Sequence, residues 1–280
     1  MASIEDKLAA LRKAAGMAPE YADILPLFTA LFDYAQVVGG RTGISVDTSG
    51  VNRSERIASG FPLVTAAELR MDRADLGSFL QGVVSVLRQH GKENTELLDQ
   101  FTRALASGML DPCPLILAVL ERRRAPLDEA AAALGLPAPL LEYLIEIPIK
   151  ISLELHSDTV PPDAVSDWHE AFCPICGSRP GMAELSGEEG RRLLSCSTCF
   201  FKWPFKRLNC PSCGSEDTEK LSYFTVGEGA TRVDTCKACS RYIKTRDSRK
   251  GNSDVPLEIE DLLTIHLDLL ASREGYERGK

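Results

Sequence analysis

Four Cys-x-x-Cys pairs between residues 173 and 239 constrain the fold of this chain more than any other feature. They are Cys173/Cys176, Cys196/Cys199, Cys210/Cys213 and Cys236/Cys239. Two intervening residues let one tight turn point both sulfurs at the same ion, and two such turns supply four thiolates. The eight cysteines therefore predict two separate metal sites, each with a complete tetrahedral shell of sulfur.

The lengths between the pairs predict how they combine. Residues 177–195 separate the first pair from the second, and residues 214–235 separate the third from the fourth. Either length suits a β-hairpin that joins two turns of one site, whereas residues 200–209 suit a link between two sites. We therefore predict one site from the first two pairs and a second site from the last two. A cross-braced combination is the alternative.

The metal that these sites hold is not decided by their ligands, because zinc and iron both accept four thiolates. A closed shell leaves no position for water or substrate, which argues against a hydrolytic zinc centre. Gly177 and Gly214 follow the first turn of each predicted site, where a positive φ would aim backbone N–H groups at sulfur. Phe200 and Ser240 hold the equivalent places in the second turns and depart from that pattern.

The cysteines are expected to be reduced. The first residues, Met-Ala-Ser-Ile-Glu-Asp-Lys, lack the apolar core of a secretory signal, and no run is long and apolar enough to span a membrane. We therefore predict a cytoplasmic protein without stable membrane insertion, in which paired cysteines bind metal rather than form disulfides. Cys113 has no partner and is predicted to be a small buried apolar residue.

The pattern of apolar residues predicts an α+β protein. In residues 1–160, helical stripes recur over 21–38, 76–87, 97–105 and 115–120, whereas 39–60 read as a loop. Residues 161–252 contain the cysteines and short strand-like runs, so we predict two rubredoxin-like or zinc-ribbon modules in which metal replaces an apolar core. A C-terminal helix is predicted within residues 253–280.

The charge distribution argues against a nucleic-acid-binding surface. The chain has a net charge of −8, although residues 171–252 carry 14 Lys and Arg against 9 Asp and Glu. Eight thiolates with two bound ions would offset much of that local positive excess. We therefore expect no nucleic-acid partner. No Ser/His/Asp or Cys/His set with a supporting motif is present, so no catalytic or cofactor-binding residue is predicted.

The cysteine region resembles the formate dehydrogenase accessory proteins, the FdhE family. The resemblance extends beyond the cysteines to Pro174, Gly177, Ser178, Pro180, the Gly190–Leu194 run, Trp203, Arg207, Tyr223, Arg232 and Tyr242–Lys244. The ending from Asp261-Leu262 through Gly275-Tyr276 also looks like that of the family. About 105 residues take part, whereas the helical half contains no matching motif.

The resemblance implies a cytoplasmic assembly factor rather than an enzyme. Such a protein would act on the catalytic subunit of respiratory formate dehydrogenase, would resemble rubredoxin with iron at its two sites, and would form a homodimer. The exposed basic residues Lys202, Lys206 and Arg207 are a hypothetical binding face for that subunit. The alternatives are a double zinc ribbon that binds nucleic acid and a rubredoxin-like electron carrier, with zinc as the alternative metal.

Overall fold

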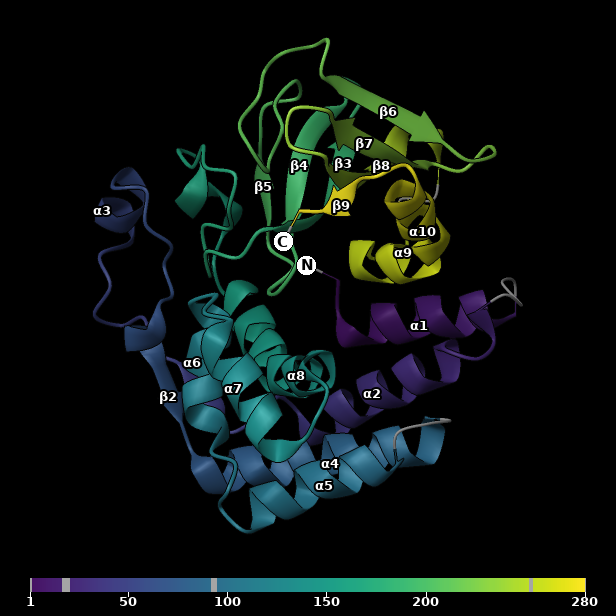
Figure 1. The fold of residues 1–280 in the computed structure, drawn as a ribbon. Coiled ribbons are helices and arrows are strands. Elements are labelled where there is room, and N and C mark those ends of the chain that lie inside the picture. Colours follow the sequence, from purple (N-terminus) through teal and green to yellow (C-terminus); the bar gives the residue numbers. More distant parts are fainter. Residues whose placement is uncertain (1, 17–20, 92–94, 252–253, 280) are drawn as a thin grey trace. The chain divides into compact units, whose positions relative to one another are not determined.

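Two compact units make up the chain. The computed structural model describes residues 2–16, 21–91, 95–251 and 254–279, and Figure 1 shows its ribbon. Unit 1 consists of Met1–Ala10, Asn52–Leu63 and Ser157–Lys280, and unit 2 consists of Leu11–Val51 and Val64–His156. The predicted division of the chain at 160/161 and 252/253 stays a prediction.

Unit 2 is built mainly from helices. They are α2 (Leu25–Val38), α4 (Arg73–His90), α5 (Thr95–Ala106), α6 (Pro112–Leu120), α7 (Ala125–Leu134) and α8 (Ala138–Ser157), and α1 (Ile4–Ala15) begins in unit 1. The four predicted apolar stripes lie on α2, α4, α5 and α6. On α4, for example, Leu76, Leu80 and Val83 are fully buried. The helical expectation for these stripes is therefore confirmed.

Helices α7 and α8 are two consecutive apolar helices of unit 2. Gly135 ends α7 with a left-handed backbone, and α8 then buries Leu144, Ile145 and Ile149 completely. Within the described ranges, no single helix is both long and apolar enough to cross a membrane. This pair meets the length and composition test only together, and its helices are bent by 116°.

Residues 39–60 are more ordered than the predicted loop. Strand β1 (Ile44–Val46) pairs antiparallel with β2 (Leu69–Met71), and α3 (Arg53–Ala58) begins where the Asn52 side chain accepts from the Glu55 amide. A 3-10 turn, η2 (Ala66–Glu68), precedes β2. The loop prediction was wrong because β1 depends on a partner strand more than twenty residues away, which local glycine and serine content does not reveal.

Unit 1 contains one mixed sheet. Its strands are β3 (Pro180–Ser186), β4 (Arg191–Cys196), β5 (Lys202–Pro204), β6 (Leu221–Thr225), β7 (Thr231–Cys236) and β8 (Arg241–Asp247). Their order is β5-β4-β3-β8-β7-β6, with β9 (Glu277–Arg278) beside β8. Two antiparallel halves meet at a parallel β3–β8 pair, which joins the two cysteine-bearing modules edge to edge (Figure 1).

The C-terminal helix is interrupted. Helices α9 (Leu257–Leu263) and α10 (Ile265–Arg273) are separated at Thr264, whereas the apolar pattern predicted one continuous helix. Leu267 and Ala271 of α10 pack against Val233 and Tyr242 of the sheet. The cysteine clusters are therefore not the only stabilising feature of unit 1, because a small apolar core also supports β7 and β8.

A buried carboxylate ties the two halves of the sheet together. Glu184 on β3 accepts from Arg246 at 2.6 Å, from Lys202 at 2.7 Å and from Ser248 at 2.6 Å. Burial alone would raise the pKa of Glu184, but these hydrogen bonds outweigh it and lower the pKa to about 2.

Replacing Glu184 with glutamine is expected to flatten the acid dependence of stability. Because the folded pKa lies below the unfolded value, the carboxylate stabilises the fold above about pH 4.5 and loses that effect as the pH falls towards 2. After allowance for the partly exposed Lys202, the difference at neutral pH should be about 2 kcal/mol. Urea unfolding of both proteins between pH 3 and 7 measures it; parallel curves would contradict the assignment.

Candidate metal centres

The eight paired cysteines gather in two groups. Within each group, one sulfur from every cysteine lies within 4.8 Å of the other three. Cluster one contains Cys173, Cys176, Cys196 and Cys199, and cluster two contains Cys210, Cys213, Cys236 and Cys239. This grouping is the one that the spacing predicted, and the cross-braced alternative is wrong.

The distances between sulfurs fit a tetrahedral ion better than a disulfide. In cluster one, Sγ of Cys173 lies 3.5 Å from that of Cys199, and Sγ of Cys176 lies 3.5 Å from that of Cys196. In cluster two, Sγ of Cys210 lies 3.8 Å from that of Cys239, and Sγ of Cys213 lies 3.8 Å from that of Cys236. A metal–sulfur bond of about 2.3 Å requires tetrahedral edges of about 3.8 Å, whereas a disulfide requires about 2.05 Å. The four sulfurs of each cluster therefore suit one ion, zinc or iron.

The turns that carry the cysteines repeat one backbone design. The amide of Gly177 donates to the carbonyl of Cys173, and that of Gly214 donates to the carbonyl of Cys210, both at 2.9 Å. Gly177 and Gly214 have φ of 72° and 74°, as predicted. Phe200 and Ser240 adopt φ of 57° and 54° although they carry side chains. The departures from glycine thus leave the turn unchanged, at the cost of local backbone strain.

A β-hairpin brings together the two cysteine turns of each cluster. Strands β3 and β4 connect the two turns of cluster one, and β6 and β7 connect those of cluster two. Both predicted hairpins are present. Strand β3 was missed by sequence reasoning, because Pro180-Gly181 opens it and its burial does not alternate.

Cluster one is enclosed by protein. Its four cysteines are at most 3% exposed. Backbone amides of Ile175 and Thr198 donate to Sγ of Cys173 and Cys196, each at 3.3 Å. Burial raises the pKa of Cys173 and Cys199, so an incoming cation must displace thiol protons to bind four thiolates.

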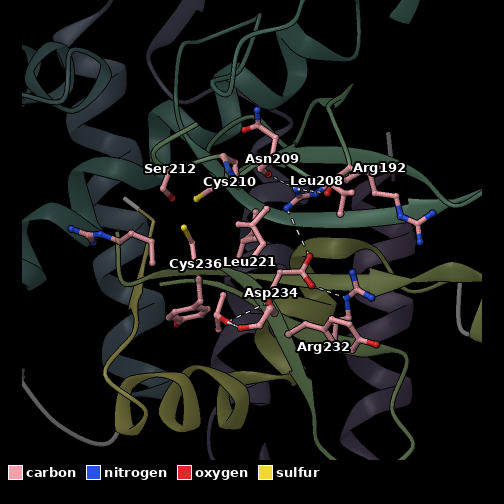
Figure 2. Close-up of a pocket in the computed structure, with 17 residues that line it drawn as sticks. Arg192, Leu208, Asn209, Cys210, Ser212, Leu221, Arg232, Asp234 and Cys236 are labelled. Carbon is pink, nitrogen blue, oxygen red and sulfur yellow. Dashed lines mark hydrogen bonds and ion pairs between the residues drawn. The ribbon is translucent and has the colours of Figure 1, made fainter. Parts of the chain in front are cut away.

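Cluster two is open to solvent on one side. Cys210 and Cys236 are buried, but Cys213 is exposed and Cys239 is half-buried. A cavity of about 110 Å³ adjoins the buried pair, with Arg192 of β4 and Arg232 and Asp234 of β7 among its lining residues (Figure 2). The two clusters thus offer the same ligands in different surroundings.

This difference predicts that the two sites lose metal at different rates. In a chelator such as EDTA, cluster two should release its ion about tenfold faster than cluster one, since solvent access weakens the protection of a metal site. Mass spectrometry of the intact protein over time would show a long-lived form with one metal per chain. Cys239→Ser should abolish the fast phase alone; a single phase in the unaltered protein would contradict the prediction.

Other residues singled out in the sequence are also placed. Cys113 is buried in α6, where burial raises its pKa, as expected of an inert apolar thiol. His169 is exposed, and His156 lies in the last turn of α8. In the hypothetical basic face, Lys202 pairs with Glu184 and Lys206 with Glu216. Arg207 instead donates to the backbone carbonyl of Glu189.

Sequence reasoning missed a set of buried charges around the modules. Arg192 is 6% exposed and Lys244 is fully buried. Each donates a hydrogen bond to a backbone carbonyl and also forms an ion pair with a carboxylate. Periodicity treats such residues as solvent-facing. The only available signal was the resemblance, whose matching positions include both residues.

The fold and the two clusters define a class: an α+β protein with tandem four-cysteine modules of the zinc-ribbon type. The family model described as FdhE, central domain, matches residues 172–207, and that described as FdhE, C-terminal domain, matches residues 208–280. The junction between the two matches falls between the two clusters. Each matched domain therefore contains one complete set of four cysteines.

Curated relatives and a solved structure agree with these matches. A Protein FdhE homolog of Aquifex aeolicus is 26% identical over 270 residues, covering 92% of this chain and 87% of that protein. One from Enterobacter sp. is 30% identical over 195 residues, covering 65% and 62% respectively. The crystal structure of the FdhE protein from Pseudomonas aeruginosa has the same fold, with a TM-score of 0.70, 19% identity and coverage of 98% and 93%. The chain belongs to the FdhE family.

Proposed function

We propose that this protein is a cytoplasmic maturation factor that binds the catalytic subunit of respiratory formate dehydrogenase during its assembly. FdhE family membership supports an accessory protein associated with formate dehydrogenase. The observation that carries the proposal is the match of both cysteine modules to FdhE domains, each with its four sulfurs gathered in space.

The two clusters serve this function as structural metal centres. Cys173, Cys176, Cys196 and Cys199 hold one ion, and Cys210, Cys213, Cys236 and Cys239 hold the other. Iron in a rubredoxin-like state is the proposed metal, with zinc as the alternative. Four thiolates complete the shell, so the bound ion would fix the turns and supply no open coordination position for a substrate.

The protein acts by binding rather than by catalysis, in this proposal. The metal-stabilised sheet of unit 1 provides a rigid scaffold for the client subunit, and the protein works as a homodimer without nucleic acid. Two bound ions would make such a scaffold more rigid, because each ion links two turns that are far apart in the sequence.

A pull-down from cells that make formate dehydrogenase tests the proposal. Tagged protein should recover the catalytic subunit, with about two thiolate-bound metals per chain in the same sample. Electronic absorption would separate iron, which gives thiolate-to-metal charge-transfer bands, from colourless zinc. A metal-loaded protein that captures no catalytic subunit under conditions that preserve weak complexes would overturn it in favour of an electron carrier or another binding module.

A further inference from the structure

The cavity beside cluster two lies between the two modules of unit 1. Strand β4 contributes Arg192 on one side, and strands β6, β7 and β8 contribute the other side. The segment 207–212, which leads into cluster two, also lines it (Figure 2). At about 110 Å³, the cavity has room for a group the size of one small side chain.

Positive charge is in excess around this cavity. Four arginines line it, but Asp234 is the only carboxylate among the lining residues. Asp234 accepts a hydrogen bond from Nε of Arg232 at 2.7 Å, and it lies 3.8 Å from a guanidinium nitrogen of Arg192. Two guanidinium groups therefore share one carboxylate. Arg241 pairs with Glu277, whereas Arg207 pairs with no carboxylate among the described residues.

Arg192, in the wall of the cavity, also has an unused donor. The Nη1 atom of Arg192 donates to the Asn209 carbonyl at 2.8 Å, yet its buried Nε–H has no acceptor. Figure 2 shows the Arg192 guanidinium directed toward Asp234 across the cavity. Buried polar groups of this kind are normally satisfied, so a missing partner points to a ligand.

The rim suits a polypeptide better than a free ion. Leu208 and Tyr223 are 62% and 60% exposed at the cavity mouth, and Arg232 lies over the Tyr223 ring. Strand β6, which carries Tyr223, is an edge strand that pairs only with β7 among the described strands. An acidic amino-acid residue supplies a carboxylate for the arginines and apolar surface for the rim, whereas an inorganic anion supplies only the charge.

We propose that this cavity binds an acidic side chain of a partner polypeptide, with Arg192, Arg207 and Arg232 facing its carboxylate. The proposal deepens the proposed function, because the partner is a bound protein segment. A competing explanation is that the arginines merely offset the negative charge of cluster two. That explanation predicts effects on metal retention and none on peptide binding.

Titration of the full, zinc-loaded chain with a capped glutamate residue (N-acetyl, C-methylamide) tests the cavity. The Arg192 Nε–H signal, assigned by its loss in Arg192→Lys, should shift in a saturable manner in proton–nitrogen NMR spectra. Capped glutamine should bind about tenfold more weakly, because it lacks the charge. Sodium acetate should also bind more weakly, since it lacks the apolar surface.

Two variants locate the effect. Arg207→Gln should weaken binding of capped glutamate several-fold without loss of metal, whereas Arg191→Gln, on an exposed position of the same strand β4, should leave it unchanged. No saturable shift up to about 10 mM, a range that still detects millimolar affinity, would overturn the proposal. An equal response to glutamine or to acetate would also overturn it.

The outcome is separable from that of the pull-down. Capture of the catalytic subunit together with an unresponsive Arg192 signal would reject the cavity and keep the maturation factor. A responsive cavity in a protein that captures no catalytic subunit would keep the acidic-segment site and reject the proposed client.

Discussion

Replacing Cys173 with alanine should leave one metal per chain and disorder the β3–β4–β5 half of the sheet. The change removes one of four buried ligands, and its sulfur lies only 3.5 Å from that of Cys199. A structural ion of this kind contributes on the order of 10 kcal/mol to folding, which is comparable with the whole stability of a domain.

The measurements for this variant are metal content per chain and limited proteolysis. Cleavage should appear within residues 172–207 and spare the helices of unit 2. Cys113→Ala is the matched control, because it removes a buried thiol that belongs to neither cluster. It should keep both metals and cost about 1 kcal/mol. A Cys173→Ala protein with two metals and unchanged proteolysis would show that Cys173 is not a required metal ligand.

The cysteine clusters could be predicted from sequence because their information is local. Two residues between cysteines define each turn, and the lengths of intervening chain select the hairpins that join them. The backbone at Phe200 and Ser240 was harder to predict, since glycine is the usual signal for a positive φ. At these two positions, the need to place four sulfurs around one point overrides the preference of non-glycine residues for a negative φ. This effect depends on the tertiary structure and leaves no local signal in the sequence.

Features that depend on distant partners escaped the sequence. Strand β1 exists because β2 lies beside it, and β3 exists because it is flanked by β4 and β8. The break at Thr264 likewise has no glycine or proline to announce it. Arg192 and Lys244 look like ordinary surface cations until the strands place them inside. Buried charged residues of this kind help to specify one arrangement of the strands and helices. The sequence alone does not identify them, because their partners are distant in the sequence.

Lys244→Met should destabilise unit 1 by about 3–5 kcal/mol, because it removes the cation from a buried charge network. The Nζ atom of Lys244 lies 2.7 Å from carboxylate oxygens of both Asp261 and Asp268, and it also donates to the Asp261 carbonyl. Arg278 contacts the same two carboxylates, so two cations balance two anions. Without Lys244, two partly buried carboxylates would share one arginine and repel each other.

Two comparison variants separate this network from a general loss of charge. Lys220→Met breaks an exposed pair with Asp217 and should cost less than about 1 kcal/mol. Adding Asp268→Asn to Lys244→Met should recover part of the loss, because Asp261 and Arg278 then form a balanced pair while the amide oxygen still accepts from Tyr242. Urea unfolding of the metal-loaded proteins measures all three. Two outcomes would contradict the prediction: Lys244→Met destabilises the protein no more than Lys220→Met, or adding Asp268→Asn destabilises the Lys244→Met protein further. Either outcome would mean that Lys244 does not offset repulsion between the carboxylates of Asp261 and Asp268. The attachment of α10 to the sheet would then depend more on the apolar contacts of Leu267 and Ala271 than on Lys244.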